Sequence, residues 1–102
     1  MITLCITYVI DQNQHGNFEE YARAWPEPIR RCGGELIGYF LPTKLAGPTN
    51  IALALIDFPN LDSYEKYRAA LAKDSAAIAN VARIEKAGCI LSENRSFLQR
   101  VP

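Results

Sequence analysis

The sequence predicts a single α+β domain in which helices cover one face of a four-stranded antiparallel sheet. Three observations support this prediction. Four segments have the β-branched and aromatic composition of strands, the regions between them have helical periodicity, and the order along the chain is β-α-β-β-α-β. The chain of 102 residues has the length of one domain and leaves no room for a separate regulatory module.

The segment Asn50–Phe58 has the pattern of a central strand. Alternate side chains of an extended chain point to opposite faces. Both faces of this segment are apolar up to Asp57: Ile51, Leu53 and Leu55 lie on one, and Ala52, Ala54, Ile56 and Phe58 on the other. A strand without a polar face lies in the middle of a sheet. We expect Ala52 and Ala54 on the side that the helices cover.

A second strand is predicted just before the central one. Gly47 and Pro48 predict a turn that joins the two as a hairpin. Simple alternation over Glu35–Leu41 puts Leu36, Gly38 and Phe40 on one face and Ile37, Tyr39 and Leu41 on the other.

The first and last strands complete the sheet. Ile2–Ile10 is rich in β-branched and aromatic residues and has no charged face, so it is also predicted to be central. The last strand begins at Cys89–Leu91, and the polar run Ser92–Ser96 indicates an exposed edge or a bulge.

The first helical region is predicted to be interrupted. Asn17 and Glu20 form a capping pair, so a helix is expected to begin near Phe18. Pro26–Pro28 removes helical hydrogen bonds and predicts a kink just after Trp25. Apolar side chains recur at helical spacing and predict a stripe that lies on the sheet: Phe18, Tyr21, Ala22, Trp25, Ile29 and Cys32.

The second helical region is predicted to contain two helices. Asp62 with Glu65 is expected to cap the first, whose apolar side chains are Leu61, Tyr64, Tyr67 and Leu71. Asp74 is expected to cap the second, over Ser75–Lys86, and Gly88 to end it. The side chains expected to point inward on this second helix are Ile78, Val81 and Ala82.

This order of elements is the ferredoxin-like arrangement, in which the first and third strands are central. Right-handed crossovers put both helical regions on the same side of the sheet. The other face, over Ile2–Ile10 and Ile51–Phe58, is apolar and would be bare in a monomer. A homodimer that packs sheet against sheet is the expected solution.

Composition argues against several partners. Hydrophobic residues make up 49% of the chain, which is typical of a folded domain, and 11 basic residues balance 11 acidic ones. We therefore expect no nucleic-acid partner. The apolar start MITLCITYVI is too short for a membrane span and is read as a strand. Three widely spaced cysteines, Cys5, Cys32 and Cys89, are expected to be reduced thiols of a cytoplasmic protein.

No motif for catalysis or for a cofactor is present. His15 is the single histidine and has no Cys, His or carboxylate cluster near it in sequence, so we expect a surface role and no metal site. Glycine-rich phosphate loops, nucleophile elbows and Cys-x-x-Cys pairs are absent. We expect no bound cofactor and assign no catalytic residue.

A small-ligand site between helices and sheet is the functional hypothesis. The small side chains of Ala52 and Ala54 are expected to leave a void beneath Trp25. Asp57 and Arg68 are charged candidates beside it. The alternative is that the aromatic side chains fill the core. The candidate ligand-binding residues are Asn50, Trp25, Tyr39, Tyr64 and Tyr67.

Several short motifs together resemble the NIPSNAP family, within the dimeric α+β barrel superfamily. They are Gly16, Asn17 and Phe18, the pair Gly38 and Tyr39, then Gly47 and Asn50, and finally Arg68, Leu71 and Asp74. The sequence departs from the family at three positions: Ala54 and Ile56 stand where members commonly have a His and a Trp, and Ala77 stands where a Trp often follows the Asp.

The resemblance implies a dimer and three functional hypotheses. The first is a NIPSNAP-like dimer of unassigned activity that binds a small apolar or aromatic ligand. The second is a cofactor-independent monooxygenase or isomerase, since such enzymes belong to the same superfamily. The third is a structural or protein-interaction dimer with a filled core. An open or a filled space beside Trp25 separates the last hypothesis from the other two.

Overall fold

The computed structural model describes residues 1–102 as one four-stranded sheet with four helices. A short 3-10 turn over Gln12–Gln14 follows the first strand. In chain order the main elements are β1 (Ile2–Ile10), α1 (His15–Arg23), α2 (Pro26–Arg31), β2 (Glu35–Phe40), β3 (Ile51–Phe58), α3 (Leu61–Leu71), α4 (Ser75–Ala87) and β4 (Ile90–Leu98). None of the helices is both long enough and apolar enough to cross a membrane.

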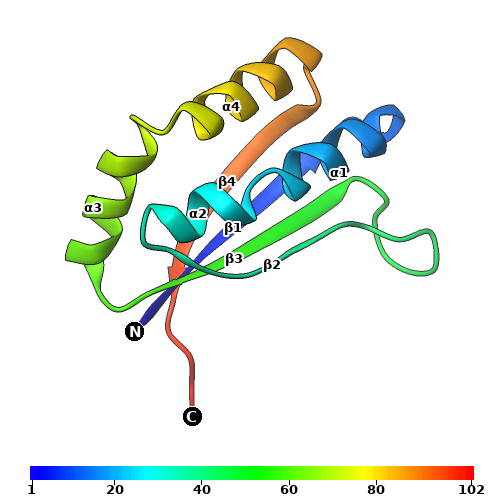
Figure 1. Cartoon of the computed structure of the whole chain (residues 1–102). Helices are drawn as coiled ribbons and strands as arrows, with labels where there is room; N and C mark the ends of the chain where they lie inside the picture. The colour runs from blue at the N-terminus through cyan, green and yellow to red at the C-terminus, as the bar shows by residue number, and fades with distance from the viewer.

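The strand order is β2-β3-β1-β4, and all neighbours are antiparallel (Figure 1). The central position of β1 and β3 and the ferredoxin-like fold are therefore confirmed. β4 forms one edge, as the polar run Ser92–Ser96 predicted. The register pairs Ile6 with Ala54 on one side and with Arg95 on the other, so these three residues lie in one row across the sheet.

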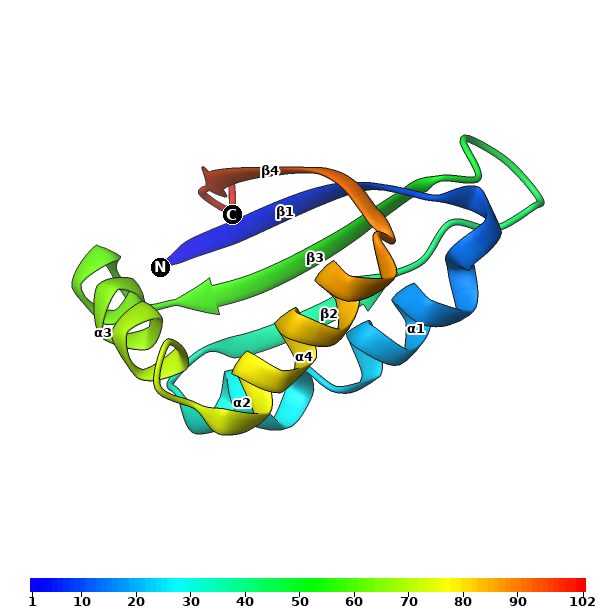
Figure 2. The ribbon, with the colours of Figure 1, turned by 90° about the horizontal axis from the view of Figure 1, so that it is seen from above.

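All four helices lie on one side of the sheet (Figure 2). The side chains of β1 and β3 on that side are at most 4% exposed, which makes this the core: Leu4, Ile6, Tyr8, Ile10, Ala52, Ala54, Ile56 and Phe58. Ala52 and Ala54 therefore lie on the helix-covered face, as expected. The other face of β3, formed by Ile51, Leu53 and Leu55, has no helix against it and stays partly exposed.

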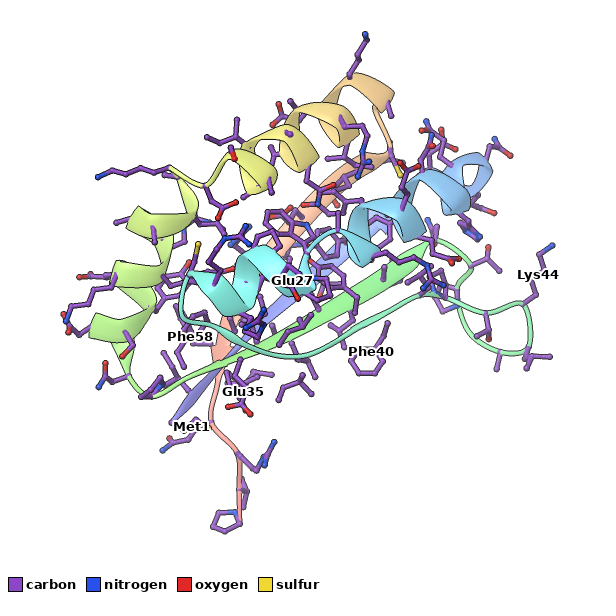
Figure 3. All side chains as sticks on the ribbon, viewed as in Figure 1. Met1, Glu27, Glu35, Phe40, Lys44 and Phe58 are labelled. Carbon is purple, nitrogen blue, oxygen red and sulfur yellow. The ribbon has the colours of Figure 1, made fainter.

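The alternation predicted for the second strand is wrong. β2 contains a bulge between Leu36 and Gly38, which adds one residue to β2 relative to β3. As a result, Leu36 and Tyr39 pair with Ile56 and Ala54, and so share the helix-covered face. Phe40 pairs with Leu53 and lies 49% exposed on the side of β2 away from α1 (Figure 3).

The first helix begins earlier than predicted. Asp11 accepts a hydrogen bond from Asn13 N at 2.9 Å and caps a 3-10 turn that leads directly into α1 at His15. Asn17 is therefore inside the helix and is not its cap; its side chain donates to Gln14. The predicted interruption after Trp25 is confirmed, because α1 ends at Arg23 and α2 begins at Pro26.

The second helical region also differs in two details. Asn60 caps α3, since its side chain accepts from Ser63 N at 2.8 Å; Asp62 lies in the first turn. Asp74 caps α4 as predicted, with Gly88 in left-handed conformation at the other end. The predicted inward face of α4 is wrong: Ile78 and Val81 are 53% and 37% exposed and Ala82 is also exposed, whereas the buried residues are Ala77, Asn80 and Ile84.

The reason is that α4 packs on α1 and not flat on the sheet. Asn80 Nδ2 donates to the carbonyl oxygen of Tyr21 at 3.0 Å, and Arg83 forms an ion pair with Glu20 at 2.7 Å. With α4 held in this way, Ile78 and Val81 line the space between α4 and α3, and Val81 also faces the space beside β4. The resulting gap is where the candidate site lies.

Candidate ligand-binding site

A hollow of about 510 Å³ lies between α3, α4 and the edge strand β4. We call it the central hollow. Its apolar lining is Trp25, Leu71, Val81, Ile84 and Ile90. Its polar lining is Tyr21, Arg68, Glu85, Glu93 and Arg95. The volume and the mixture of an apolar wall with a few polar groups are those of small-molecule sites.

Two further spaces adjoin the central hollow. One is an apolar groove of about 360 Å³ between α3 and α4, which includes the outward-facing Ile78. The other is a narrow space of about 30 Å³ that reaches inward to the tyrosines of the core. Trp25, Arg68 and Leu71 line all three spaces, so these residues mark their meeting point.

Trp25 is held at this point by the break between α1 and α2. Its backbone N–H donates to Ala22, its carbonyl accepts from Ile29 N at 3.0 Å, and its ring meets Tyr21 edge to face at 5.6 Å. The residue is only 5% exposed. Nevertheless its indole Nε1 has no hydrogen-bond partner, unlike every other buried side-chain nitrogen and oxygen.

Tyrosine hydroxyls surround the inner end of the site. The hydroxyls of Tyr8 and Tyr39 lie 3.2 Å apart and share a hydrogen bond. Burial raises the pKa of Tyr8, Tyr21 and Tyr39, and raises that of Tyr67 to about 12. The Trp25 indole partly opposes the rise in the Tyr21 pKa, but the two groups do not reach hydrogen-bond geometry. These hydroxyls are therefore neutral donors near neutral pH.

Four charged side chains stand around the central hollow. Arg95 and Glu93 form an ion pair at 2.7 Å on the helix-facing side of β4. Arg68 projects from α3 and belongs to none of the ion pairs in the protein. Glu85 comes from α4. The four charges sum to zero, and the guanidinium of Arg68 and the carboxylate of Glu85 both remain outside the ion pairs.

The structure brings together three of the five residues predicted from sequence. Trp25 lines the central hollow, and Tyr39 and Tyr67 line the narrow inner space. Tyr64 packs instead against the ring of Phe97, at 4.9 Å and 86°. Asn50 lines a separate shallow hollow at the other end of β3, beside Asp11, and its carbonyl oxygen accepts from Ile10 N at 2.8 Å.

The expected void over Ala52 and Ala54 is not present. Aromatic rings fill the space above these alanines. The ring centroid of Phe18 lies 5.0 Å from that of Tyr8 and 6.3 Å from that of Tyr39. The open space is displaced toward β4, which no helix covers closely. Asp57 lies on the helix-free face, where its carboxylate accepts from Thr3 at 2.5 Å, and is therefore not part of the site.

Sequence reasoning missed the contributions of β4 and α4. Ile90 was predicted only as part of the start of the last strand, Glu93 and Arg95 as part of an exposed edge or a bulge, and Glu85 was given no role. A signal was present, because Glu93, Arg95 and Phe97 alternate along the strand and so share one face. That face is the helix-facing one, since Arg95 pairs with Ile6 and Phe97 with Leu4.

The fold is that of a ferredoxin-like α+β protein. The NIPSNAP family model matches residues 3–102, so the chain belongs to the NIPSNAP family. The resemblance inferred from Gly16, Gly38 and Asn50 is thereby confirmed. A search of curated proteins gave no match.

Solved structures agree with this assignment. Atu4242 from Agrobacterium tumefaciens, a NIPSNAP family protein with unknown function, has 22% identity and a TM-score of 0.85, with 99% of this chain and 94% of that chain covered. An uncharacterized NIPSNAP domain protein from Burkholderia xenovorans has 19% identity and a TM-score of 0.80, with 99% and 95% covered. SnoaB, a cofactor-independent oxygenase from Streptomyces nogalater, has 11% identity and a TM-score of 0.68, with 99% and 93% covered. At these identities the likeness shows the fold alone.

Proposed function

We propose that this NIPSNAP protein binds a small apolar or aromatic molecule in the central hollow between its helices and sheet. The observation that carries the proposal is the open space of about 510 Å³ beside the buried Trp25. A core filled by aromatic side chains was the alternative, and the rings of Tyr8, Phe18 and Tyr39 do fill the region over Ala54. They do not fill the region toward β4, which supports a binding role.

The test is a screen of small aromatic fragments against the purified protein. Because Trp25 is the single tryptophan, its fluorescence reports directly on the site, and a thermal shift reports binding independently. Val81→Phe, which adds bulk to the wall of the hollow, is expected to abolish both signals. Ala79→Phe is the matched control, since Ala79 is exposed on the same helix and lines none of the three spaces.

A different result would remove the proposal. If fragments bind equally well to the wild type and to Val81→Phe, the central hollow is not the binding site. If no fragment raises the melting temperature or changes the Trp25 signal, the protein is better described as a structural dimer.

Cofactor-independent oxygenation or isomerisation is a second candidate. The neutral hydroxyls of Tyr21 and Tyr67 and the free indole N–H of Trp25 are suited to stabilise an enolate or phenolate oxygen. The fold shared with SnoaB is compatible with this role. The measurement is oxygen uptake with each bound fragment; binding without consumption or isomerised product counts against an enzyme.

We also propose that the protein is a homodimer joined through the helix-free face of the sheet. Ile51, Leu53 and Leu55 are partly exposed there, and Phe40 and Leu98 are 49% and 48% exposed. An apolar face of this kind favours burial against a second copy. Sedimentation at micromolar concentration tests the proposal, and a stable monomer would contradict it.

A cytoplasmic location is proposed on the state of the cysteines. Cys5, Cys32 and Cys89 are all free thiols, as expected in a reducing compartment. Fractionation of cells that produce the protein tests this, and recovery in an extracytoplasmic fraction would contradict it.

A further inference from the structure

We infer that the molecule bound in the central hollow carries a carbonyl or carboxylate oxygen, which accepts a hydrogen bond from the Trp25 indole N–H. This inference rests on the proposed binding function and specifies the chemistry of the ligand. It assigns to Trp25 the role of the group that orients the ligand at the inner wall of the site.

The first argument is that Trp25 Nε1 is a buried donor without an acceptor. Nearly all buried polar groups in proteins are hydrogen-bonded, because an unpaired buried donor loses its contact with water and gains nothing in return. The side chain is held in place by its edge-to-face contact with Tyr21, and the backbone is bonded on both sides to Ala22 and Ile29. Rotation of the indole toward another acceptor therefore conflicts with the packing, whereas a ligand oxygen that reaches Nε1 from the adjoining space satisfies the donor.

The second argument is that no acceptor of the site bonds to the Trp25 indole, although the carboxylate of Glu85 lines the central hollow outside the ion pairs. Tyr8 and Tyr39 already share one hydrogen bond, and the carboxylate of Glu93 is occupied by Arg95. Donors remain at Trp25 and at Arg68, which has no ion-pair partner. The group missing beside Trp25 Nε1 is an acceptor oxygen, and the ligand is the molecule that supplies it.

The third argument concerns the rest of the ligand. Away from these donors the wall is apolar, with Leu71, Val81, Ile84 and Ile90. An apolar body with one sp² oxygen matches both parts of the lining. A ketone and a carboxylate share this oxygen, and they differ in whether Arg68 adds an ion pair.

The experiment uses three naphthalene probes of the same ring and nearly the same size. They are 2-ethylnaphthalene, which has no acceptor, 2-acetonaphthone, which has a neutral carbonyl, and 2-naphthoate, which has a carboxylate. With ¹⁵N-labelled protein, the single indole N–H gives one resolved NMR signal. We expect the two oxygen-bearing probes to move this signal downfield and to bind about tenfold more tightly than 2-ethylnaphthalene.

The variant Trp25→Phe removes the donor and keeps an aromatic ring. It is expected to bind 2-acetonaphthone no more tightly than 2-ethylnaphthalene, while 2-naphthoate keeps only what Arg68 adds. Arg68→Gln is expected to weaken 2-naphthoate alone. If Trp25→Phe does not fold, the indole signal of the wild type still decides the matter. Equal binding of all three probes with an unmoved indole signal would overturn the inference and leave the proposed binding function intact. Absence of binding by every probe, with no signal from the central hollow perturbed, would overturn both.

Discussion

Arg31 at the end of α2 donates two hydrogen bonds to Asp74, the residue that caps the start of α4. Arg31 Nε donates to Asp74 Oδ2 at 2.9 Å and Arg31 Nη2 donates to Oδ1 at 3.0 Å. The same carboxylate caps α4 by accepting from Ala77 N at 3.0 Å. The Asp74 side chain therefore joins α2 to the first turn of α4, the helix that forms one wall of the central hollow.

The charge on Asp74 is expected to make stability depend on pH. Hydrogen bonds from Arg31 and from the backbone of Ala77 lower the pKa of Asp74 from 3.8 to about 2. A folded-state pKa below the unfolded value stabilises the fold at pH values above the unfolded pKa, and this stabilisation is lost as the pH falls through the folded pKa. Asp74→Asn keeps a capping side chain but no charge. Its melting temperature is expected to lie below that of the wild type at pH 7, and the difference to shrink between about pH 4 and pH 2.

Thermal unfolding followed by circular dichroism across this pH range makes the measurement. Asp62→Asn serves as the control, since Asp62 has only an exposed pair with Lys66 at 3.1 Å. A difference for Asp74→Asn that stays constant down to pH 2 would contradict the assignment of the ion pair.

Two glycines are expected to respond oppositely to alanine. A Cβ on Gly34 would lie 2.9 Å from Ile29 Cγ2 and 3.1 Å from Ile56 Cγ2, whereas a Cβ on Gly16 would meet nothing within 4 Å. Gly34→Ala is expected to destabilise the fold by about 1–3 kcal/mol through overpacking. Gly16→Ala lies inside α1 and is expected to stabilise it by about 0.5–1 kcal/mol. Urea unfolding of both variants checks the prediction. An unchanged free energy of unfolding for Gly34→Ala would show that the neighbouring side chains make room for the extra methyl group.

The shared hydrogen bond of Tyr8 and Tyr39 gives a further prediction. Tyr39→Phe removes one hydroxyl and leaves the Tyr8 hydroxyl buried without this partner, which is expected to cost about 1 kcal/mol. Tyr64→Phe is the control, because Tyr64 makes its contacts to Phe58 and Phe97 through its ring. Equal unfolding free energies for the two variants in urea would mean that the hydroxyl pair contributes nothing.

The proposal that the helix-free face of the sheet is the dimer interface can be tested by introducing one charged side chain there. Leu53 lies on this face between Thr7 and Phe40. Leu53→Glu is expected to convert the proposed dimer into a monomer, since a buried unpaired carboxylate is costly. Leu45→Glu, at a position that is 93% exposed in the loop before β3, is expected to leave the dimer unchanged. Analytical ultracentrifugation distinguishes the two, and a dimeric Leu53→Glu would direct the search to another surface.

Local patterns were enough to predict most of the fold. The apolar runs of β1 and β3 predicted that these strands are central, and the alanines of β3 were correctly expected beneath the helices. The proline pair predicted the break after Trp25, and Asp74 and Gly88 predicted the ends of α4. Each of these features depends on a few neighbouring residues, so the sequence contains the signal in full.

Features that depend on contacts between distant segments were not predictable in this way. The bulge in β2 moves Tyr39 to the core face. Gly38 beside the bulge is a local sign of it, because a glycine within a strand often marks a bulge, but it does not fix the register. The inward face of α4 is set by the bonds from Asn80 to Tyr21 and from Arg83 to Glu20, which are separated by 59 and 63 residues. Hydrophobic periodicity alone selected Ile78 and Val81, which line the groove between α3 and α4 instead.

The sequence by itself therefore determined the order of the elements, the central strands, the family and the position of Trp25 at a helix break. Only the tertiary structure decided where the empty space lies and which side chains surround it. The physical reason is that a cavity is a property of packing: it arises where α4, held on α1, stands away from β4. Arg95 and Arg68 come from distant segments and meet at Trp25 only because the chain folds in this way.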